Sequence, residues 1–422
     1  MNKRKNSCKG RYAIGMAVVL AMLFGTSCSK VLSVSDEERS SRTVLVYLGG
    51  DNNLSGEVAQ KREALRRGRR SFPGGELLLY EDTGSGARLL RIAPGGILET
   101  VADYGAENSA SAAVFGRVLR DVLSGYPADG YGLVFFSHGS GWLPAGSLQN
   151  PRRAASPATG SPSSLASSGS RSMGWDDGGG KDMPEGMTHA EMELDEFAAA
   201  IPDGTLDFII FEACLMAGVE VAYALRGKAE YLLASPAEII SPGFTPVYPE
   251  ALGYLLDRSQ STDLSLKAFG ERYMTHVHTL EGDYRSATLS VVSTQELDLL
   301  AARTRELHLS FTGRTDIINE LQHFDRPGSY GDSPAVARYF DLGQWAEAAD
   351  SPASYASWRE QLERTIVWKA CTEHFLPNQN GFAIRHYSGL TTYTEQEELP
   401  ALNEYYRTTA WYRALWHGTA SE

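Results

Sequence analysis

The stretch FIIFEACLMAGVEVAYALR, residues 208–226, joins two different hydrophobic patterns at a cysteine. Its first part is a short run of bulky apolar residues, which is typical of a strand buried on both faces of a sheet. Its second part is apolar at helical spacing. The stretch therefore predicts a buried strand that passes into a helix at Cys214, two residues after Glu212.

Further apolar runs repeat the strand pattern, and helical stretches separate them. The run TVLVYLGG begins at Thr43, GYGLVFFSHGSGW carries His138 at the end of its apolar part, and AEYLLASPAEI ends its apolar part near Ser235. Strands that alternate with helices predict an α/β fold with a mostly parallel sheet. Such sheets gather functional side chains at the carboxyl ends of their strands. We therefore expect His138 and Cys214 to meet at one edge if their strands are neighbours.

The patterns also divide the chain into regions. We expect the catalytic domain to cover residues 43–260 and a mainly helical region, residues 261–422, to pack on it. An insert at residues 144–187 contains AASPATGSPSSLASSGSRS, which has almost no apolar content. Such a segment cannot bury enough surface to order itself, so the sequence predicts a mobile surface loop.

The first 27 residues have the pattern of an export signal. Basic residues precede an apolar run at residues 13–24, which is too short to span a bilayer. The small residues GTSC then end at Cys28, which resembles a bacterial lipoprotein signal whose cysteine becomes the lipid-modified N-terminus. The alternative is a plain secretory signal. We expect residues 28–42 to be a tether and the protein to be lipid-anchored in the bacterial envelope, at the outer membrane or cell surface.

Charge and cysteine content exclude some classes of partner and fold. The net charge of −13 becomes −18 once the five positive charges of the leader are subtracted, so nucleic acid is not expected as a partner. Of the four cysteines, only Cys214 and Cys371 lie beyond the leader, which is too few for a disulfide framework. We expect Cys371 to be a buried, inert thiol.

A cysteine and a histidine at strand ends can perform nucleophilic catalysis. The thiolate attacks a carbonyl carbon, and the imidazole protonates the leaving amine. A helix that begins at Cys214 would lower the pKa of the thiol through its dipole and free N–H groups. The backbone N–H groups of Cys214 and Gly139 could then hold the oxyanion.

The segments SHGSGW, EACLMAGVEVAYALR and ASPAEI together resemble the clostripain-like cysteine peptidases (family C11, clan CD), which are relatives of caspases. The likeness continues through VLVYLGGDNNLS, YFDLGQW and YSGLTTY, so it covers nearly the whole mature chain. The chain closely resembles exported members from Bacteroides-type bacteria. The resemblance implies a caspase-like fold and cleavage of peptides after Arg or Lys. It also implies that His138 is the general acid/base and Cys214 the nucleophile.

One position departs from the family pattern. The family has Asp two residues before the cysteine, at the floor of the pocket for the basic P1 side chain, whereas this chain has Glu212. The resemblance implies that Glu212 and Glu238 form this S1 pocket. For Glu238 a solvated loop acid is the alternative. The departure at Glu212 also favours a second hypothesis, in which the chain is a weak or inactive pseudo-peptidase that binds peptides or a surface partner.

The insert and the acidic stretches give two further expectations. We expect cleavage within the insert after a basic residue (Arg152, Arg153, Arg171 or Lys181), against the alternative that it is a surface insertion without a role. No cofactor is required by the sequence. Calcium stays open, because family members sometimes use it and residues 176–182 (DDGGGKD) are acidic and rich in glycine. An EF-hand at Asp51 is rejected because its twelfth position is Arg62.

Overall fold

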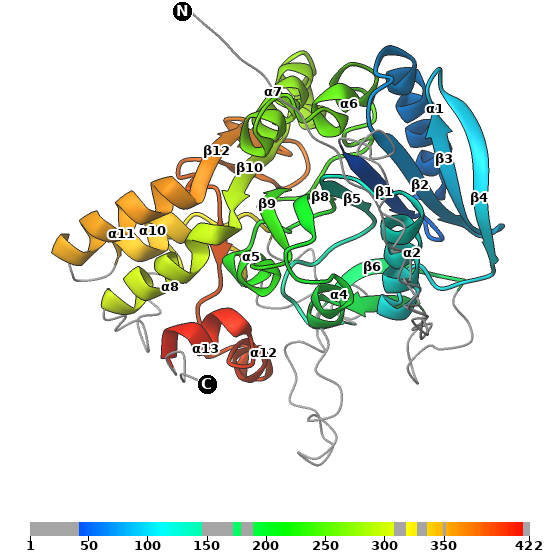
Figure 1. Cartoon of the computed structure of the whole chain (residues 1–422). Helices are drawn as coiled ribbons and strands as arrows, with labels where there is room; N and C mark the ends of the chain where they lie inside the picture. The colour runs from blue at the N-terminus through cyan, green and yellow to red at the C-terminus, as the bar shows by residue number, and fades with distance from the viewer. Residues whose placement is uncertain are drawn as a thin grey trace, which may run out of the picture. The chain divides into compact units, whose positions relative to one another are not determined.

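A nine-stranded mixed sheet lies at the centre of the computed structural model, with the strand order β12-β10-β9-β8-β5-β1-β2-β3-β4 (Figure 1). The five strands in the middle are parallel to one another. They are β1 (Thr43–Gly49), β2 (Glu76–Thr83), β5 (Tyr131–Phe136), β8 (Leu206–Glu212) and β9 (Ala229–Ala234). The prediction of an α/β fold with a caspase-like, mostly parallel sheet is thus confirmed.

Antiparallel strands complete the sheet at both edges. The hairpin of β3 (Gly86–Ala93) and β4 (Ile97–Gly105) forms one edge, and β10 (Thr288–Ser293) with β12 (Ile366–Cys371) forms the other. Since β10 and β12 come from the region after residue 260, that region shares the sheet. Residues 39–422 accordingly form one compact unit, without a division at residue 261.

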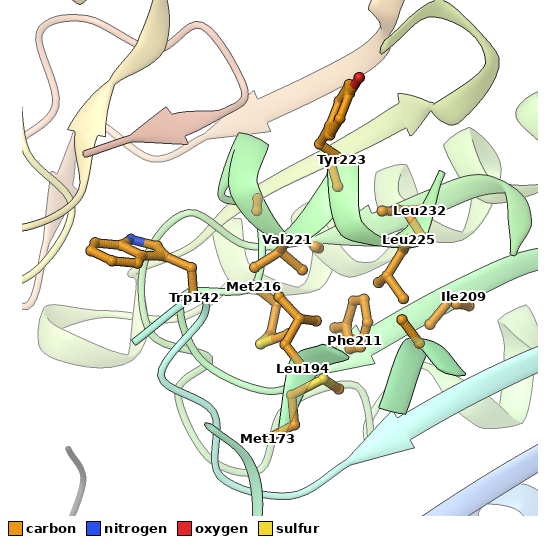
Figure 2. Close-up of a cluster of buried hydrophobic side chains, with 14 of the residues drawn as sticks. Trp142, Met173, Leu194, Ile209, Phe211, Met216, Val221, Tyr223, Leu225 and Leu232 are labelled. Carbon is orange, nitrogen blue, oxygen red and sulfur yellow. The ribbon is translucent and has the colours of Figure 1, made fainter. Parts of the chain in front are cut away.

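Helices cover both faces of the sheet, as Figure 1 shows. One face carries α1 (Ser55–Ser71), α6 (Tyr248–Leu256) and α7 (Thr262–His278), and the other carries α2 (Ala112–Gly125), α4 (Leu194–Ala200) and α5 (Val219–Leu225). Phe208 and Ile210 pack into the core of the first face, whereas Ile209 and Phe211 pack into that of the second, where Figure 2 draws them. Burial of both faces explains why β8 is apolar at every position before Glu212 except Asp207.

The remaining elements lie mostly in the C-terminal region, where the predicted helical character is present. The helices are α8 (Leu297–Glu306), α10 (Leu342–Glu347), α11 (Pro352–Thr365), α12 (Pro400–Tyr406) and α13 (Ala410–Trp416), with 3-10 turns η2 (Gly282–Tyr284) and η3 (Thr294–Glu296). Short strand pairs join β11 (Phe340–Asp341) to β15 (Thr391–Thr392) and β13 (His374–Phe375) to β14 (Phe382–Ala383).

The structure describes residues 42–145, 172–178, 189–307, 318–326, 336–348 and 352–416. The leader, Cys28 and the four basic residues Arg152, Arg153, Arg171 and Lys181 lie outside these ranges. Every helix in the described ranges is too short or too polar to cross a membrane.

Two predicted boundaries need correction. The insert predicted to be a mobile loop contains β6 (Ser172–Asp176), which pairs antiparallel with β7 (Ala190–Glu193). The predicted tether ends in Arg42, which is fully buried because its guanidinium pairs with Asp207 at 2.9 Å. Arg42 and part of the insert are therefore packed in the described body.

Candidate active site

The catalytic candidates stand at the ends of two adjacent parallel strands. Phe136 at the end of β5 pairs with Glu212 at the end of β8. His138 and Cys214 each follow two residues later, so both lie at the same level of the sheet edge. The backbones are close there, because a Cβ added to Gly139 would stand 2.8 Å from the carbonyl oxygen of Cys214. The backbones at His138 and Cys214 therefore lie at the same edge of the sheet.

His138 is half-buried and contacts a residue that follows β1. Its Nε2 lies 2.6 Å from Oδ1 of Asn53, and because an amide oxygen can only accept, this contact needs a proton on Nε2. The ring also lies 5.2 Å from the Trp175 ring. Burial lowers the pKa of His138, while the charges of Asp177 and Glu57 oppose that shift. The imidazole is therefore neutral over a wider pH range than a solvated histidine, as a general base requires.

Cys214 occupies a turn, and the helix after it begins later than predicted. Leu215 has a φ of 64°, a left-handed conformation that is costly for a residue with a Cβ. Residues 215–217 then run beside the segment after β9, with Leu215 N–H donating to Ala237 O at 3.0 Å. The helix α5 starts only at Val219. The N-terminus of α5 is therefore not at Cys214, where it was expected to lower the pKa of the thiol.

The surroundings of the thiol favour its protonated form. The half-buried Sγ accepts a hydrogen bond from the Ile239 N–H at 3.4 Å. Burial and then the charge of Glu238 raise the pKa of Cys214 to about 12, while the Ile239 N–H and the Arg326 guanidinium oppose this shift. In this conformation the cysteine is a thiol near neutral pH, which corrects the prediction of an activated thiolate.

Glu212, predicted to line the S1 pocket, is buried and accepts hydrogen bonds from three donors. Its Oε1 accepts from Lys61 Nζ at 2.5 Å and from Phe244 N–H at 2.6 Å, and its Oε2 accepts from the Tyr248 hydroxyl at 2.7 Å. The side chains of Lys61 and Glu212 are 0% and 1% exposed. The charge of Glu212 is thus already balanced within the protein, which argues against direct pairing with a substrate cation.

Lys61 was missed by the sequence reasoning, although a signal existed. It lies on α1 three residues after Val58 and three before Ala64, and both of these are buried. A lysine at helical spacing within an apolar face needs a buried acidic partner, because an unpaired buried charge is very costly. That spacing alone could have pointed to a partner for Glu212.

Glu238 lies in the loop after β9, next to the residue that contacts the thiol. Its carboxylate accepts from Arg326 Nη2 at 2.9 Å and from Arg326 Nε at 3.2 Å. The side chains are 27% exposed for Glu238 and 23% for Arg326. Glu238 is therefore a partly exposed acid near Cys214, and its charge is paired with Arg326.

Trp175 from the insert and His189, which follows the insert, form an aromatic cluster beside His138. The Trp175 ring stacks on His189 with centroids 3.6 Å apart, and His189 Nε2 lies 2.8 Å from Glu191 Oε1. The backbone N–H of Trp175 also donates to the Ser137 hydroxyl at 3.1 Å. The sequence reasoning missed this group because the low-complexity composition around it predicted a disordered loop.

The acidic residues do not assemble into a recognised metal centre. Asp51, Asp82 and Asp176 are near one another, and burial together with the charges of Asp176 and Asp51 raises the pKa of Asp82 to about 8. Asp176 is held by the Ser109 N–H and hydroxyl, both at 2.7 Å. Within the described ranges, no group of three or more His, Cys, Asp or Glu side chains could hold a metal ion.

A mixed sheet with central parallel strands, and a histidine and a cysteine two residues beyond neighbouring strand ends, is the arrangement expected from the resemblance to clostripain-like peptidases. The model of the Clostripain family matches residues 46–393, and the chain therefore belongs to this family.

Individual relatives agree with this assignment. Clostripain from Hathewaya histolytica is 25% identical over 247 residues, which cover 51% of this chain and 43% of that protein. An inactive zymogen C11 protease from Parabacteroides distasonis is structurally similar, with a TM-score of 0.70, 28% identity and coverage of 89% of this chain and 98% of that one. A secreted C11 cysteine protease from Bacteroides thetaiotaomicron, crystallised with an irreversible peptide inhibitor, has a TM-score of 0.70, 26% identity and coverage of 89% and 99%.

Proposed function

We propose that this chain is a cysteine endopeptidase in which Cys214 is the nucleophile and His138 the general acid/base. The pairing of Phe136 with Glu212 carries the proposal, because it fixes both candidates at the same level of adjacent strands. Membership of the Clostripain family supports the class of reaction. The thiol and the imidazole are the groups that acyl transfer to a cysteine requires.

The proposed reaction follows from the protonation states. Neutral His138 accepts the thiol proton as Cys214 Sγ attacks the carbonyl carbon, and the oxyanion is held by the backbone N–H groups of Gly139 and Cys214. The imidazolium then gives this proton to the leaving amine, and water hydrolyses the thioester. Because Asn53 Oδ1 accepts from Nε2–H, the lone pair of the neutral ring is on Nδ1, and this is the nitrogen that takes the thiol proton.

For the substrate, we propose peptides cleaved after Arg or Lys, with Glu238 as the carboxylate that recognises the P1 side chain. Glu238 is partly exposed and next to Ile239, whose N–H contacts the thiol. Glu212 stands under the site and has its charge satisfied by Lys61, so we assign it a supporting role within the same pocket wall. The net charge of −13 favours basic peptides over acidic ones.

Export, anchoring and processing are further parts of the proposal. We infer export through the leader, a lipid on Cys28, and cleavage within the insert after Arg152, Arg153, Arg171 or Lys181. The description of the Bacteroides thetaiotaomicron relative as secreted supports export. Calcium dependence stays a separate question, tested by adding a chelator to the active enzyme.

A pseudo-peptidase is the second candidate, and the thiol environment favours it. The pKa of Cys214 is raised to about 12 by burial and by the charge of Glu238, which disfavours the thiolate. A thiol-directed probe with an Arg or Lys recognition group separates the two functions. Labelling of Cys214 in the parent, and its loss in His138→Ala, is expected for the peptidase. An unlabelled parent whose thiol still reacts with a small neutral alkylating agent identifies the pseudo-peptidase.

A further inference from the structure

Glu238, the acid proposed to recognise the substrate, forms an ion pair with Arg326 of this chain. Arg326 Nη2 and Nε donate to the two carboxylate oxygens of Glu238 at 2.9 and 3.2 Å. Two nitrogens facing two oxygens form the fork-like arrangement in which a guanidinium binds a carboxylate most strongly. This is also the arrangement that a P1 arginine of a substrate would adopt on Glu238.

The pair lies at the reacting thiol. Glu238 precedes Ile239, and the Ile239 N–H donates to Cys214 Sγ at 3.4 Å. Arg326 is also tied to the chain by its Nη1, which donates to Gln379 O at 3.2 Å. The guanidinium thus has two attachments, one of which is the acid beside the nucleophile.

The two acids predicted to select basic substrates are therefore both paired with basic side chains of this chain. Glu212 is held by Lys61, and Glu238 by Arg326. The Lys61 pair is buried and cannot open without leaving charges in the core. The Arg326 pair has solvent on both partners, so its opening costs far less.

We propose that Arg326 occupies the subsite for the basic P1 side chain. As its occupant, Arg326 competes with the P1 arginine or lysine of a substrate for Glu238. This inference rests on the proposed specificity for basic residues. A substrate with a neutral P1 side chain gains nothing from Glu238 and is indifferent to the occupant. A substrate with a basic P1 side chain has to displace Arg326 first.

The occupant makes basic peptides bind more weakly than a free Glu238 would allow. Removal of Arg326 frees the carboxylate, and a charge-assisted pair with the substrate then forms without a competitor. We expect a gain of roughly tenfold in affinity, which corresponds to a modest difference in free energy. Arg326→Lys retains a cation near Glu238 and should keep most of the competition.

A purely structural role for Arg326 predicts different results. If the arginine only braces the loop after β9 against Gln379, its removal disturbs the pocket for every peptide. Binding of basic and neutral peptides would then weaken together, and the melting temperature would fall. If the role of Arg326 is purely structural, the ratio of the two binding affinities, basic peptide to neutral peptide, therefore stays unchanged.

The experiment measures peptide binding by the mature chain carrying Cys214→Ala, so that cleavage does not interfere. Two peptides that differ only in P1, Arg against the uncharged norleucine, are titrated by calorimetry into this protein and into its Arg326→Ala and Arg326→Lys derivatives. Arg359→Ala is the matched control, since Arg359 is an exposed arginine on α11 that pairs with Glu363 at 3.1 Å.

The inference predicts that Arg326→Ala tightens the Arg peptide roughly tenfold and leaves the norleucine peptide unchanged. Arg359→Ala should change neither. Unchanged or weaker binding of the Arg peptide to the Arg326→Ala protein overturns the inference. The proposed function is judged separately, by hydrolysis of the same two peptides by the chain with Cys214 intact. Absence of hydrolysis there refutes the peptidase, whatever the binding ratio is.

Discussion

Two ion pairs flank the reacting thiol, and they differ in their access to solvent. Lys61–Glu212 lies under the strand end with side chains 0% and 1% exposed, whereas Arg326–Glu238 lies at the rim with side chains 23% and 27% exposed. A buried pair is costly to break because each partner would be left without hydration, while a partly exposed pair exchanges with water at little cost. The comparison teaches that two carboxylates near one nucleophile can serve as a fixed support and as a replaceable contact.

The largest effect is expected at the thiol between the two pairs. Cys214→Ala should abolish peptide cleavage, and His138→Ala should reduce its rate by about 100- to 10,000-fold, because proton transfer to the leaving amine is lost. Neither change should lower the melting temperature much, since both residues are half-buried at strand ends. Turnover of fluorogenic peptides and thermal melts check this. Substantial hydrolysis by the Cys214→Ala protein would remove the nucleophile assignment.

A second prediction tests whether the Lys61 pair is a support. Glu212→Gln removes the nearer of the two carboxylates that pair with buried Lys61, leaving Glu57 at 3.5 Å, and should cost up to about 3 kcal/mol in free energy of unfolding. Urea denaturation measures the loss. The double change Lys61→Met with Glu212→Gln should recover much of it, because no unpaired charge then remains. A Glu212→Gln protein of normal stability that has lost only its basic P1 selectivity would reverse the roles assigned to the two acids.

The rim pair should behave in the opposite way. Glu238→Gln should cost about 1 kcal/mol or less in stability, because Arg326 regains water. The preference for an Arg over a norleucine P1 should fall in the same variant. Comparing kcat/KM for the two peptides, together with a urea titration, tests both parts. A large loss of stability with unchanged selectivity would show that both pairs are supports.

The smallest effect concerns the pH dependence of the thiol. A pKa of about 12 means that the reactive thiolate fraction of Cys214 is small at neutral pH and grows about tenfold per pH unit up to that pKa. Alkylation by iodoacetamide should therefore rise throughout the range from pH 7 to 10. Because the Glu238 charge raises the pKa, Glu238→Gln should alkylate faster than the parent at any one pH. An alkylation rate that levels off near pH 7 would contradict the described resting state.

The sheet and the places of His138 and Cys214 at the ends of neighbouring strands could be predicted because both depend on local patterns. Apolar runs mark buried strands, and parallel strands end at a common edge. The start of α5 could not be predicted, because Leu215 adopts a left-handed conformation that no local pattern signals and the next residues pair with the segment after β9. The Arg326–Glu238 contact joins residues 88 positions apart, so only the fold brings them together.

The position of Arg42 has a consequence for the geometry of access. Arg42 is buried against Asp207 at the beginning of β8, and Thr43 starts β1, which runs parallel to β8 for seven residues. At the usual rise of a strand, this separates the entry of the chain from the catalytic edge by roughly 20 Å. The chain therefore enters the described body at the end of the parallel strands opposite His138 and Cys214.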